Sequence, residues 1–329
     1  MYPIVPLWAA LLFVAIGLWV LTWSADKFVD GAEAVARSFG VSPFIIGMVI
    51  IGFGTSAPEL AVSAISGTMG HSNLSLGNAY GSNIFNIAVI LGIAALIRPV
   101  TVRPMVAFVA SPLLVGISVL SCLLVCTGDG FSRTDGAIQL LSFAVLLPLY
   151  CWLDRKSKAA VISKEETSSA CAMKHPWLVL DVGLVLLVIS SHLLVWSAVA
   201  VARALGISEL MIGLTIVAAG TSLPELASAI ASARKGQNDF VLGNIIGSNF
   251  FNTLAVVGLS GTICPFKEVS PHVLYRDLPV MVLLSLSIGI FGVNYRKPAA
   301  DGRISRCEGS VWLLVFLVYA ILLIMQEIL

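Results

Sequence analysis

Ten stretches of about 20 apolar residues constrain what this chain can fold into, because a stretch of that length spans a lipid bilayer as an α-helix. Hydrophobic residues make up 58% of the 329 residues and charged residues only 11%, against roughly 45 to 50% and 25% in soluble domains. We therefore predict an all-α polytopic membrane protein with ten transmembrane helices, at about 7–25, 43–66, 74–97, 105–126, 136–153, 177–201, 209–232, 240–263, 278–293 and 310–327.

The longest polar connection divides the predicted spans into two sets of five. We take residues 1–153 and 176–329 as two five-helix repeats and residues 154–175 as a linker. Basic residues are retained on the cytoplasmic side of membrane proteins. With the N-terminus outside, the inner loops contain 15 Lys and Arg residues and the outer loops contain four. This bias predicts extracytoplasmic termini, a cytoplasmic linker and a location in the cell (inner) membrane.

The two halves repeat one another in sequence. GTSAPE (54–59) recurs as GTSLPE (220–225), and GNAYGSNIFN (77–86) recurs as GNIIGSNFFN (243–252) with seven of ten residues identical; both pairs are 166 residues apart. Five predicted spans, an odd number, separate each motif from its copy, so the second copy crosses the membrane in the opposite direction. Inverted-topology repeats of this kind are typical of secondary transporters, which bind substrate near the midplane between the repeats.

The GTSxPE motif breaks a predicted membrane helix. Pro58 and Pro224 have no amide hydrogen, so the carbonyls four residues earlier, at Gly54 and Gly220, lose their helical hydrogen bonds. Free carbonyls are tolerated at membrane depth only where they are packed in protein or line a wet cavity. Each copy adds two hydroxyl groups and a carboxylate around the break, on Thr55, Ser56 and Glu59 and on Thr221, Ser222 and Glu225.

The two glutamates indicate a cation. An ionised side chain at the centre of a bilayer costs at least about 2.5 to 3.5 kcal/mol. Glu59 and Glu225 lie at equivalent positions of the two repeats, and each would carry this cost. Neither motif contains a Lys or Arg to pair with them. Oxygen ligands without nitrogen or sulfur suit hard cations such as Na⁺ and Ca²⁺, whereas zinc or copper would require His or Cys.

The second motif offers further oxygens. Its Ser and Asn are four residues apart and share a helix face, as Ser82 with Asn86 and Ser248 with Asn252. We expect this face to turn toward the broken helices. The glycines of the same motif form a small-xxx-small pattern that lets helix backbones approach closely.

Other classes of function fit less well. A formal net charge of +1 without a basic stripe argues against nucleic acid as a partner. An intramembrane hydrolase would need a nucleophile with a His base or a metal, and neither repeat motif contains a His, so we do not expect an enzyme. A cation channel could use the same oxygens, but it would conduct ions without exchange.

The two motifs in an antiparallel repeat of five spans closely resemble the α-repeats of the calcium/cation antiporter superfamily, the sodium/calcium exchangers. The resemblance covers nearly the whole chain and implies a ten-helix bundle with four ion sites in a diamond-like central cluster. It implies Na⁺/Ca²⁺ antiport with no cofactor beyond the transported ions and with the lipid bilayer as surroundings. The short linker lacks a large regulatory domain, which implies a small prokaryotic-type member.

The resemblance also implies roles for single residues. Glu59 and Glu225 would be the carboxylates shared by the Ca²⁺ and Na⁺ sites. Thr55, Thr221 and the backbone carbonyls near Gly52 and Ala218 would bind Ca²⁺ or Na⁺. The remaining ligands would be Ser56, Ser82, Ser222 and Ser248 at the outer Na⁺ positions, with Asn86 and Asn252 as the central pair.

One departure from the family pattern concerns that central pair. Some relatives carry an Asp at one of the two positions, but Asn86 and Asn252 leave this core with two carboxylates. H⁺/Ca²⁺ antiport and K⁺-dependent Na⁺/Ca²⁺ antiport therefore stay open as alternatives. In each case we expect competing ion sets to bind the same oxygens, and the first and sixth spans, which carry no motif, to slide over the core.

Overall fold

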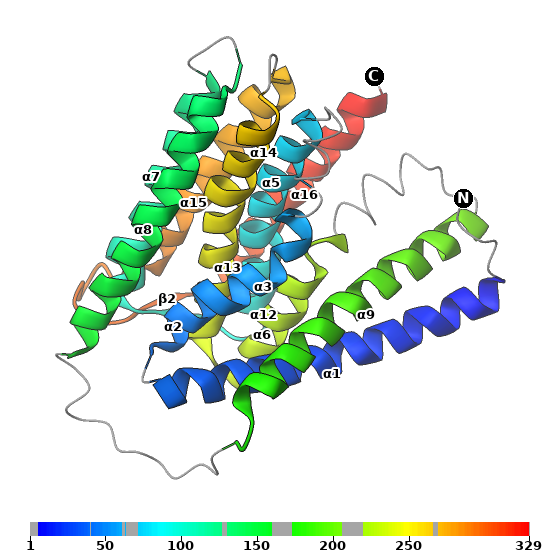
Figure 1. The fold of residues 1–329 in the computed structure, drawn as a ribbon, viewed down its shortest axis with the longest axis horizontal. Coiled ribbons are helices and arrows are strands. Elements are labelled where there is room, and N and C mark those ends of the chain that lie inside the picture. Colours follow the sequence, from blue (N-terminus) through cyan, green and yellow to red (C-terminus); the bar gives the residue numbers. More distant parts are fainter. Residues whose placement is uncertain are drawn as a thin grey trace.

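The computed structural model describes residues 6–39, 41–60, 63, 72–126, 130–159, 173–205, 220–265 and 269–328, which are mostly helical (Figure 1). In the first half the elements are α1 (Leu7–Phe39), α2 (Pro43–Ile46), η1 (Gly47–Ile51), α3 (Gly52–Thr55), α5 (Ser72–Phe85), η2 (Asn86–Leu91), α6 (Gly92–Ile97), β1 (Val100–Val102), η3 (Val106–Ala110), α7 (Ser111–Cys126) and α8 (Arg133–Ala159), where η denotes a π-helical turn. In the second half they are α9 (Pro176–Ala204), α12 (Leu223–Lys235), α13 (Asn238–Phe250), η5 (Phe251–Val256), α14 (Val257–Ile263), η6 (Val273–Asp277), α15 (Leu278–Gly292), β2 (Gly302–Ile304) and α16 (Arg306–Ile328).

Eight of the described helical stretches are long and apolar enough to cross a membrane. They are Leu7–Ser38, Ser75–Ile97, Val106–Cys126, Arg133–Lys156, Pro176–Ala202, Asn238–Ile263, Val273–Gly292 and Arg306–Met325. The other two predicted spans, 43–66 and 209–232, are those with the GTSxPE motifs. Their described parts are shorter, Pro43–Thr55 and α12, and residues 61–62, 64–71 and 206–219 lie outside the described residues. The described residues thus contain eight spanning helices, whereas the sequence predicts ten.

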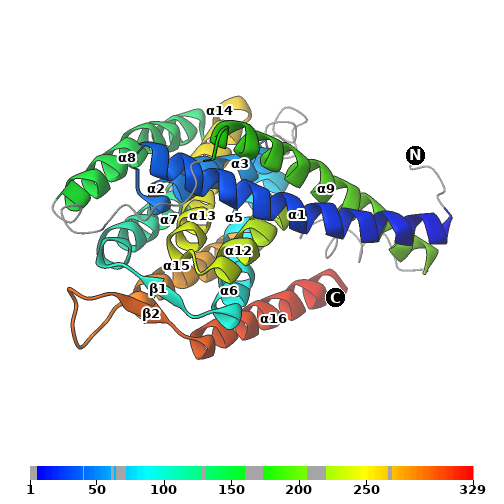
Figure 2. The same ribbon diagram turned by 90° about the horizontal axis from the view of Figure 1, so that it is seen from below.

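The helices that carry the second motif form the centre of the bundle. In the apolar stretch of Asn238–Ile263, 94% of the residues are buried, and in Ser75–Ile97 the share is 72%. In Arg306–Met325 it is only 17%, as expected for a helix with one face toward lipid. Figure 2 shows α13 in the middle of the bundle and α16 at its edge. The core is therefore built around the residues predicted to bind ions.

The order of elements in the first half recurs in the second. α5 and α13 carry the two copies of the second motif, which are 166 residues apart. Each continues into a π-helical turn and then a short α-helix, η2 with α6 and η5 with α14. A further π-helical turn precedes both α7 and α15. Such turns are rare and often lie at functional sites, and Asn86 and Asn252 both lie in one.

α1 and α9 lie side by side and run obliquely to the other helices (Figure 1). A Cβ atom added to Gly17 would meet Leu194, and one added to Gly183 would meet Phe28, so the two helices are antiparallel. Gly17 corresponds to Gly183 and Phe28 to Leu194 at the 166-residue offset, so the sequence repeat relates the two contacts to each other. α1 is 33 residues long, which is about 50 Å of helix. It therefore extends well beyond the predicted span 7–25.

The charged second half of α1 is tied to the end of α12. The Lys235 ammonium group lies 2.7 Å from a carboxylate oxygen of Asp30 and 3.7 Å from one of Asp26. The Gln237 amide donates a hydrogen bond to the Glu33 carboxylate. These contacts join the α1/α9 pair to the bundle at one end of α1.

A two-stranded antiparallel sheet adds to the helical architecture and corrects the all-α prediction. β1 pairs with β2 in the register Val100 with Ile304, Thr101 with Arg303 and Val102 with Gly302. Each strand has three residues, which is too short for an alternating hydrophobic pattern to be recognisable in the sequence. The sheet joins two connections that are about 200 residues apart, and only the tertiary structure brings them together.

Glycines allow α13 to contact the first broken segment through the backbone, as the small-xxx-small pattern predicts, whereas an added Cβ at Gly77 or Gly81 of α5 meets no described atom within 4 Å. A Cβ atom at Gly243 would lie 2.5 Å from the carbonyl oxygen of Phe44, and one at Gly247 would lie even closer to the carbonyl oxygen of Met48. Distances this short leave no room for a side chain.

We expect Gly247→Ala to lower thermal stability, because overpacking a close helix contact costs about 1 to 3 kcal/mol. The measurement is the unfolding midpoint of the purified protein in detergent, followed by tryptophan fluorescence. Gly116→Ala in α7 is the matched control, since no described atom lies within 4 Å of its added Cβ. Equal midpoints for the two variants would contradict this close packing.

Candidate cation-binding site

Both GTSxPE motifs interrupt their helices at the serine. Ser56 ends α3 with φ −85° and ψ 3°, and Ser222 precedes α12 with φ −91° and ψ 10°. Residues 57–60 are helical again after the first break. The proline two residues after each serine cannot donate the next helical hydrogen bond. The hydroxyl groups and carboxylates of the motif are therefore held at a turn between two helical segments.

The two breaks face each other across the repeats. The Ser56 hydroxyl donates a hydrogen bond to Oε1 of Glu225 at 3.2 Å. Ser222 and Thr221 lie close to the carboxylate of Glu59. Each glutamate is thus surrounded by hydroxyl groups from the other repeat.

The glutamates are buried together, and no described basic side chain pairs with either of them. Glu59 and Glu225 are each 1% exposed. Glu225 accepts from Ser56, which lies three residues before Glu59, so the two carboxylates belong to one polar cluster. Buried carboxylates in this position require a cation or protons for neutrality.

Part of the polar face of the second motif meets a broken helix. The Ser222 hydroxyl lies 3.5 Å from that of Ser82, and the amide of Asn86 donates to Oδ1 of Asn249 at 3.0 Å. Ser248 and Asn252 are buried on the central helix formed by α13 and η5. Ser82 of α5 therefore contacts the second break, and Asn86 of η2 contacts the central helix.

Asn244 and Asn249 belong to the same cluster, and the sequence analysis did not single them out. The Asn244 amide donates to the backbone carbonyl of Glu225 at 3.2 Å and to the hydroxyl of Ser228 at 2.9 Å. Its Oδ1 lies 3.4 Å from the Thr55 hydroxyl. The sequence contains a signal that Asn244 belongs to the site, because it lies four residues before Ser248 on one helix face and is identical in both repeats.

Six buried side-chain oxygens of the motif residues lack a hydrogen-bond partner among the described residues. Native proteins leave only a few buried polar groups unpaired, and each one calls for an explanation such as an ion. Carboxylate, amide and hydroxyl oxygens together form the ligand set of Na⁺ and Ca²⁺. The six are both Oε atoms of Glu59, Oε2 of Glu225, Oδ1 of Asn86 and Asn252, and Oγ of Ser248.

Three predicted ligands differ from the others: one already accepts a hydrogen bond, one is less buried, and one lies outside the described residues. The Gly52 carbonyl already accepts a hydrogen bond from the Ser56 amide at 3.1 Å. Thr221 is half-buried in the turn before α12, whereas Thr55 is fully buried. Ala218 lies outside the described residues.

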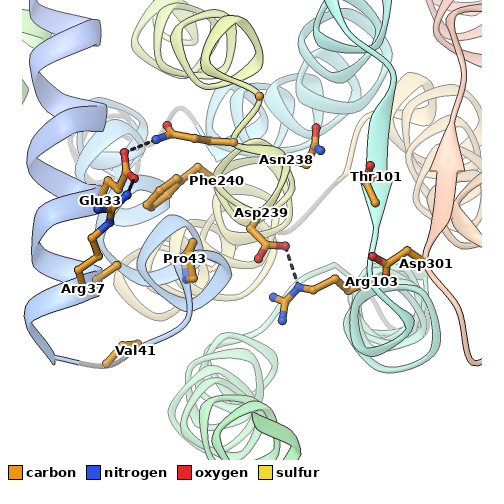
Figure 3. Close-up of a pocket in the computed structure, with 13 residues that line it drawn as sticks. Glu33, Arg37, Val41, Pro43, Thr101, Arg103, Asn238, Asp239, Phe240 and Asp301 are labelled. Atoms are coloured by element: carbon orange, nitrogen blue, oxygen red, sulfur yellow. Dashed lines mark hydrogen bonds and ion pairs between the residues drawn. The ribbon is translucent and has the colours of Figure 1, made fainter. Parts of the chain in front are cut away.

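A polar cleft of about 590 Å³ lies elsewhere, at the end of α1 (Figure 3). Glu33 and Arg37 of α1 line one side, and Arg103 and Asp239, which form a 2.8 Å ion pair, line the other. None of the predicted ion ligands lines this cleft. Its mixed charge distinguishes it from the oxygen cluster between the broken helices, which stays the candidate site.

Two broken helices that meet at a buried cluster of oxygen atoms define the class of multi-pass membrane proteins that bind cations. The family described as "Sodium/calcium exchanger protein" matches this chain over residues 9–152 and 175–325. The chain belongs to the sodium/calcium exchanger family.

Curated relatives match along nearly their full length. The CaxA protein of Alkalimonas amylolytica is 40% identical over 95% of this chain and 98% of its own length. The inner membrane protein YrbG of Escherichia coli is 39% identical over 88% and 89%. The sodium/calcium exchanger MaX1 of Methanosarcina acetivorans is 30% identical over 95% and 97%.

Solved structures of the sodium-calcium exchanger NCX_Mj have a similar fold. The structure soaked with 2.5 mM Na⁺ and 1 mM Sr²⁺ superposes with a TM-score of 0.79 at 31% identity and covers 94% of this chain and 96% of that one. The structure soaked with 2.5 mM Na⁺ and 0.1 mM Ca²⁺ gives a TM-score of 0.79 at 30% identity, with coverage of 94% and 97%.

We expect Ca²⁺ to raise the thermal unfolding midpoint of the purified protein, because a ligand that binds only the folded state stabilises it. Glu59→Gln should remove most of this rise, since it removes one of two charges that bind the ion. Glu308→Gln in α16 is the matched control, because Gln can still accept the capping hydrogen bond from Ser305. A Ca²⁺ response of normal size in Glu59→Gln would rule out this site.

Proposed function

We propose that this protein is a secondary antiporter that exchanges Na⁺ for Ca²⁺ at the cluster between the two broken helices. The observation that carries the proposal is the buried pair Glu59 and Glu225, in which three of the four carboxylate oxygens have no hydrogen-bond partner among the described residues. Their two negative charges match one Ca²⁺. Membership of the sodium/calcium exchanger family, and relatives named as exchangers, support Na⁺ and Ca²⁺ as the ions.

Exchange follows from competition for shared oxygens. Na⁺ and Ca²⁺ use the same ligand types, and a site with two carboxylates does not hold a Ca²⁺ and a full set of Na⁺ ions together. Each ion set therefore displaces the other. Antiport requires that only the loaded protein switches between its inward-facing and outward-facing states.

The architecture proposed for this function has ten transmembrane helices in two inverted repeats, residues 1–153 and 176–329, joined by a cytoplasmic linker at 154–175. The recurring order of elements supports it, as do the α1/α9 contacts that exchange under the repeat offset. The distribution of basic residues supports termini outside the cytoplasm.

The conformational change proposed is a movement of α1 and α9 over the remaining bundle. Two features support this choice. Neither helix carries a repeat motif, and the pair runs obliquely to the central helices (Figure 1). Glycine contacts such as Gly17 with Leu194 join α1 and α9 closely, so the two can move together.

A Na⁺ gradient should drive Ca²⁺ uptake into proteoliposomes that contain the wild-type protein, and Glu59→Gln or Glu225→Gln should abolish it. Removing one charge leaves the buried site unable to neutralise Ca²⁺. Glu308→Gln should transport normally. Near-normal uptake by either site variant, when folded, would refute the assignment of these glutamates.

The coupling ion is tested in the same vesicles by imposing gradients of Na⁺, H⁺ or K⁺ one at a time. We expect uptake with the Na⁺ gradient alone. Uptake driven by H⁺ would identify an H⁺/Ca²⁺ antiporter, and a requirement for K⁺ beside Na⁺ would identify K⁺-dependent exchange. Ca²⁺ flux without any counter-gradient would indicate a channel.

A further inference from the structure

One face of α9 lies across both helix breaks. A Cβ atom added to Gly54 would lie 2.9 Å from a methyl carbon of Leu184, and one added to Gly220 would lie 2.5 Å from a methyl carbon of Val195. Ser191 lies between these two residues on the same face of the helix, because residues spaced by four and seven positions align along a helix. α9 therefore covers the first residue of both GTSxPE motifs in this structure.

Ser191 makes the polar contact of this face. Its hydroxyl donates a hydrogen bond to the backbone carbonyl of Gly220 at 3.2 Å, and the residue is buried. The Gly220 carbonyl is the one that Pro224 leaves without its usual helical donor. A serine inside a membrane helix commonly bonds to its own helix, and the neighbouring Ser190 does so, to the Leu187 carbonyl at 3.0 Å. Ser191 bonds instead to the broken helix.

We propose that Ser191 is a positioning residue of the transport cycle, whose hydroxyl holds α9 against the second helix break by capping the Gly220 carbonyl. This inference rests on the proposed function. A buried carbonyl without a donor is unfavourable, so the contact stabilises the state in which α9 covers the break. When α9 moves away, the carbonyl loses this donor and becomes available to water or to an ion.

The cap is one-sided. At the 166-residue offset, the counterpart of Ser191 is Ala25 on α1, which has no hydroxyl. α1 therefore has no equivalent donor for the Gly54 carbonyl. Two repeats of equal structure would give the inward-facing and outward-facing states similar energies, and the single cap favours one of them.

The test is Ser191→Ala in proteoliposomes, with the apparent KM for Ca²⁺ measured from each side of the membrane. A shift between the two states changes the two KM values in opposite directions. We expect their ratio to change about two- to tenfold, the range for one net hydrogen bond. Ser191→Thr, which keeps the hydroxyl, should restore the wild-type ratio, and Ser190→Ala should leave it unchanged.

Hydrogen–deuterium exchange gives a readout that needs no transport. In Ser191→Ala, the amides of residues 220–223, 225 and 226 should exchange about two- to tenfold faster than in the wild type, because exchange follows the fraction of time the break is uncovered. Failure of the wild type to transport Ca²⁺ would refute the proposed function and not this contact. Unchanged exchange in Ser191→Ala, or an equal change in Ser190→Ala, would refute the role of Ser191.

Discussion

The structure depends on the burial of two carboxylates and two interrupted helices, because no described basic side chain pairs with either carboxylate. Glu225 accepts a hydrogen bond from Ser56 of the opposite repeat, which brings the two breaks together. Backbone groups in a membrane must be satisfied within the protein, or they must line a polar cavity. A cation bound among the oxygens at the breaks would satisfy these buried groups. The carboxylates and carbonyls that are costly to bury are therefore the groups that would bind the ion.

Packing around the cluster differs between α13 and the α1/α9 pair. α13 contacts the first broken segment through glycine backbone and is almost entirely buried, which makes it a rigid wall of the site. α1 and α9 contact each other extensively and meet the bundle through fewer contacts. These include an apolar cluster with Ile46, Ala227 and Phe240 and the polar contacts of Lys235 with Asp30 and of Ser191 with Gly220. The movement of α1 and α9 proposed above would disturb fewer contacts than a movement of α13.

Several parts of the structure were not predictable from sequence patterns, for identifiable reasons. The β1/β2 sheet has strands of three residues and joins connections far apart in the chain, so no local pattern indicates it. α1 continues past its apolar run because Asp26, Asp30 and Glu33 find partners or solvent at its charged end. Asn244 was missed although its spacing from Ser248 was available, because an Asn within a membrane helix is recognised as part of a site only when its partners are known.

The sequence by itself determined the helical membrane class, the repeat, the helix breaks and the oxygen character of the site, because apolar length, proline chemistry and ligand type are local properties. It also identified Glu59 and Glu225, since a buried charge without a basic partner is visible in the chain. The tertiary structure alone decided which side chains meet. Ser56 with Glu225, Asn86 with Asn249 and Ser191 with the Gly220 carbonyl are contacts between distant segments. Their geometry arises from how the helices pack, and packing depends on all of the contacting surfaces at once.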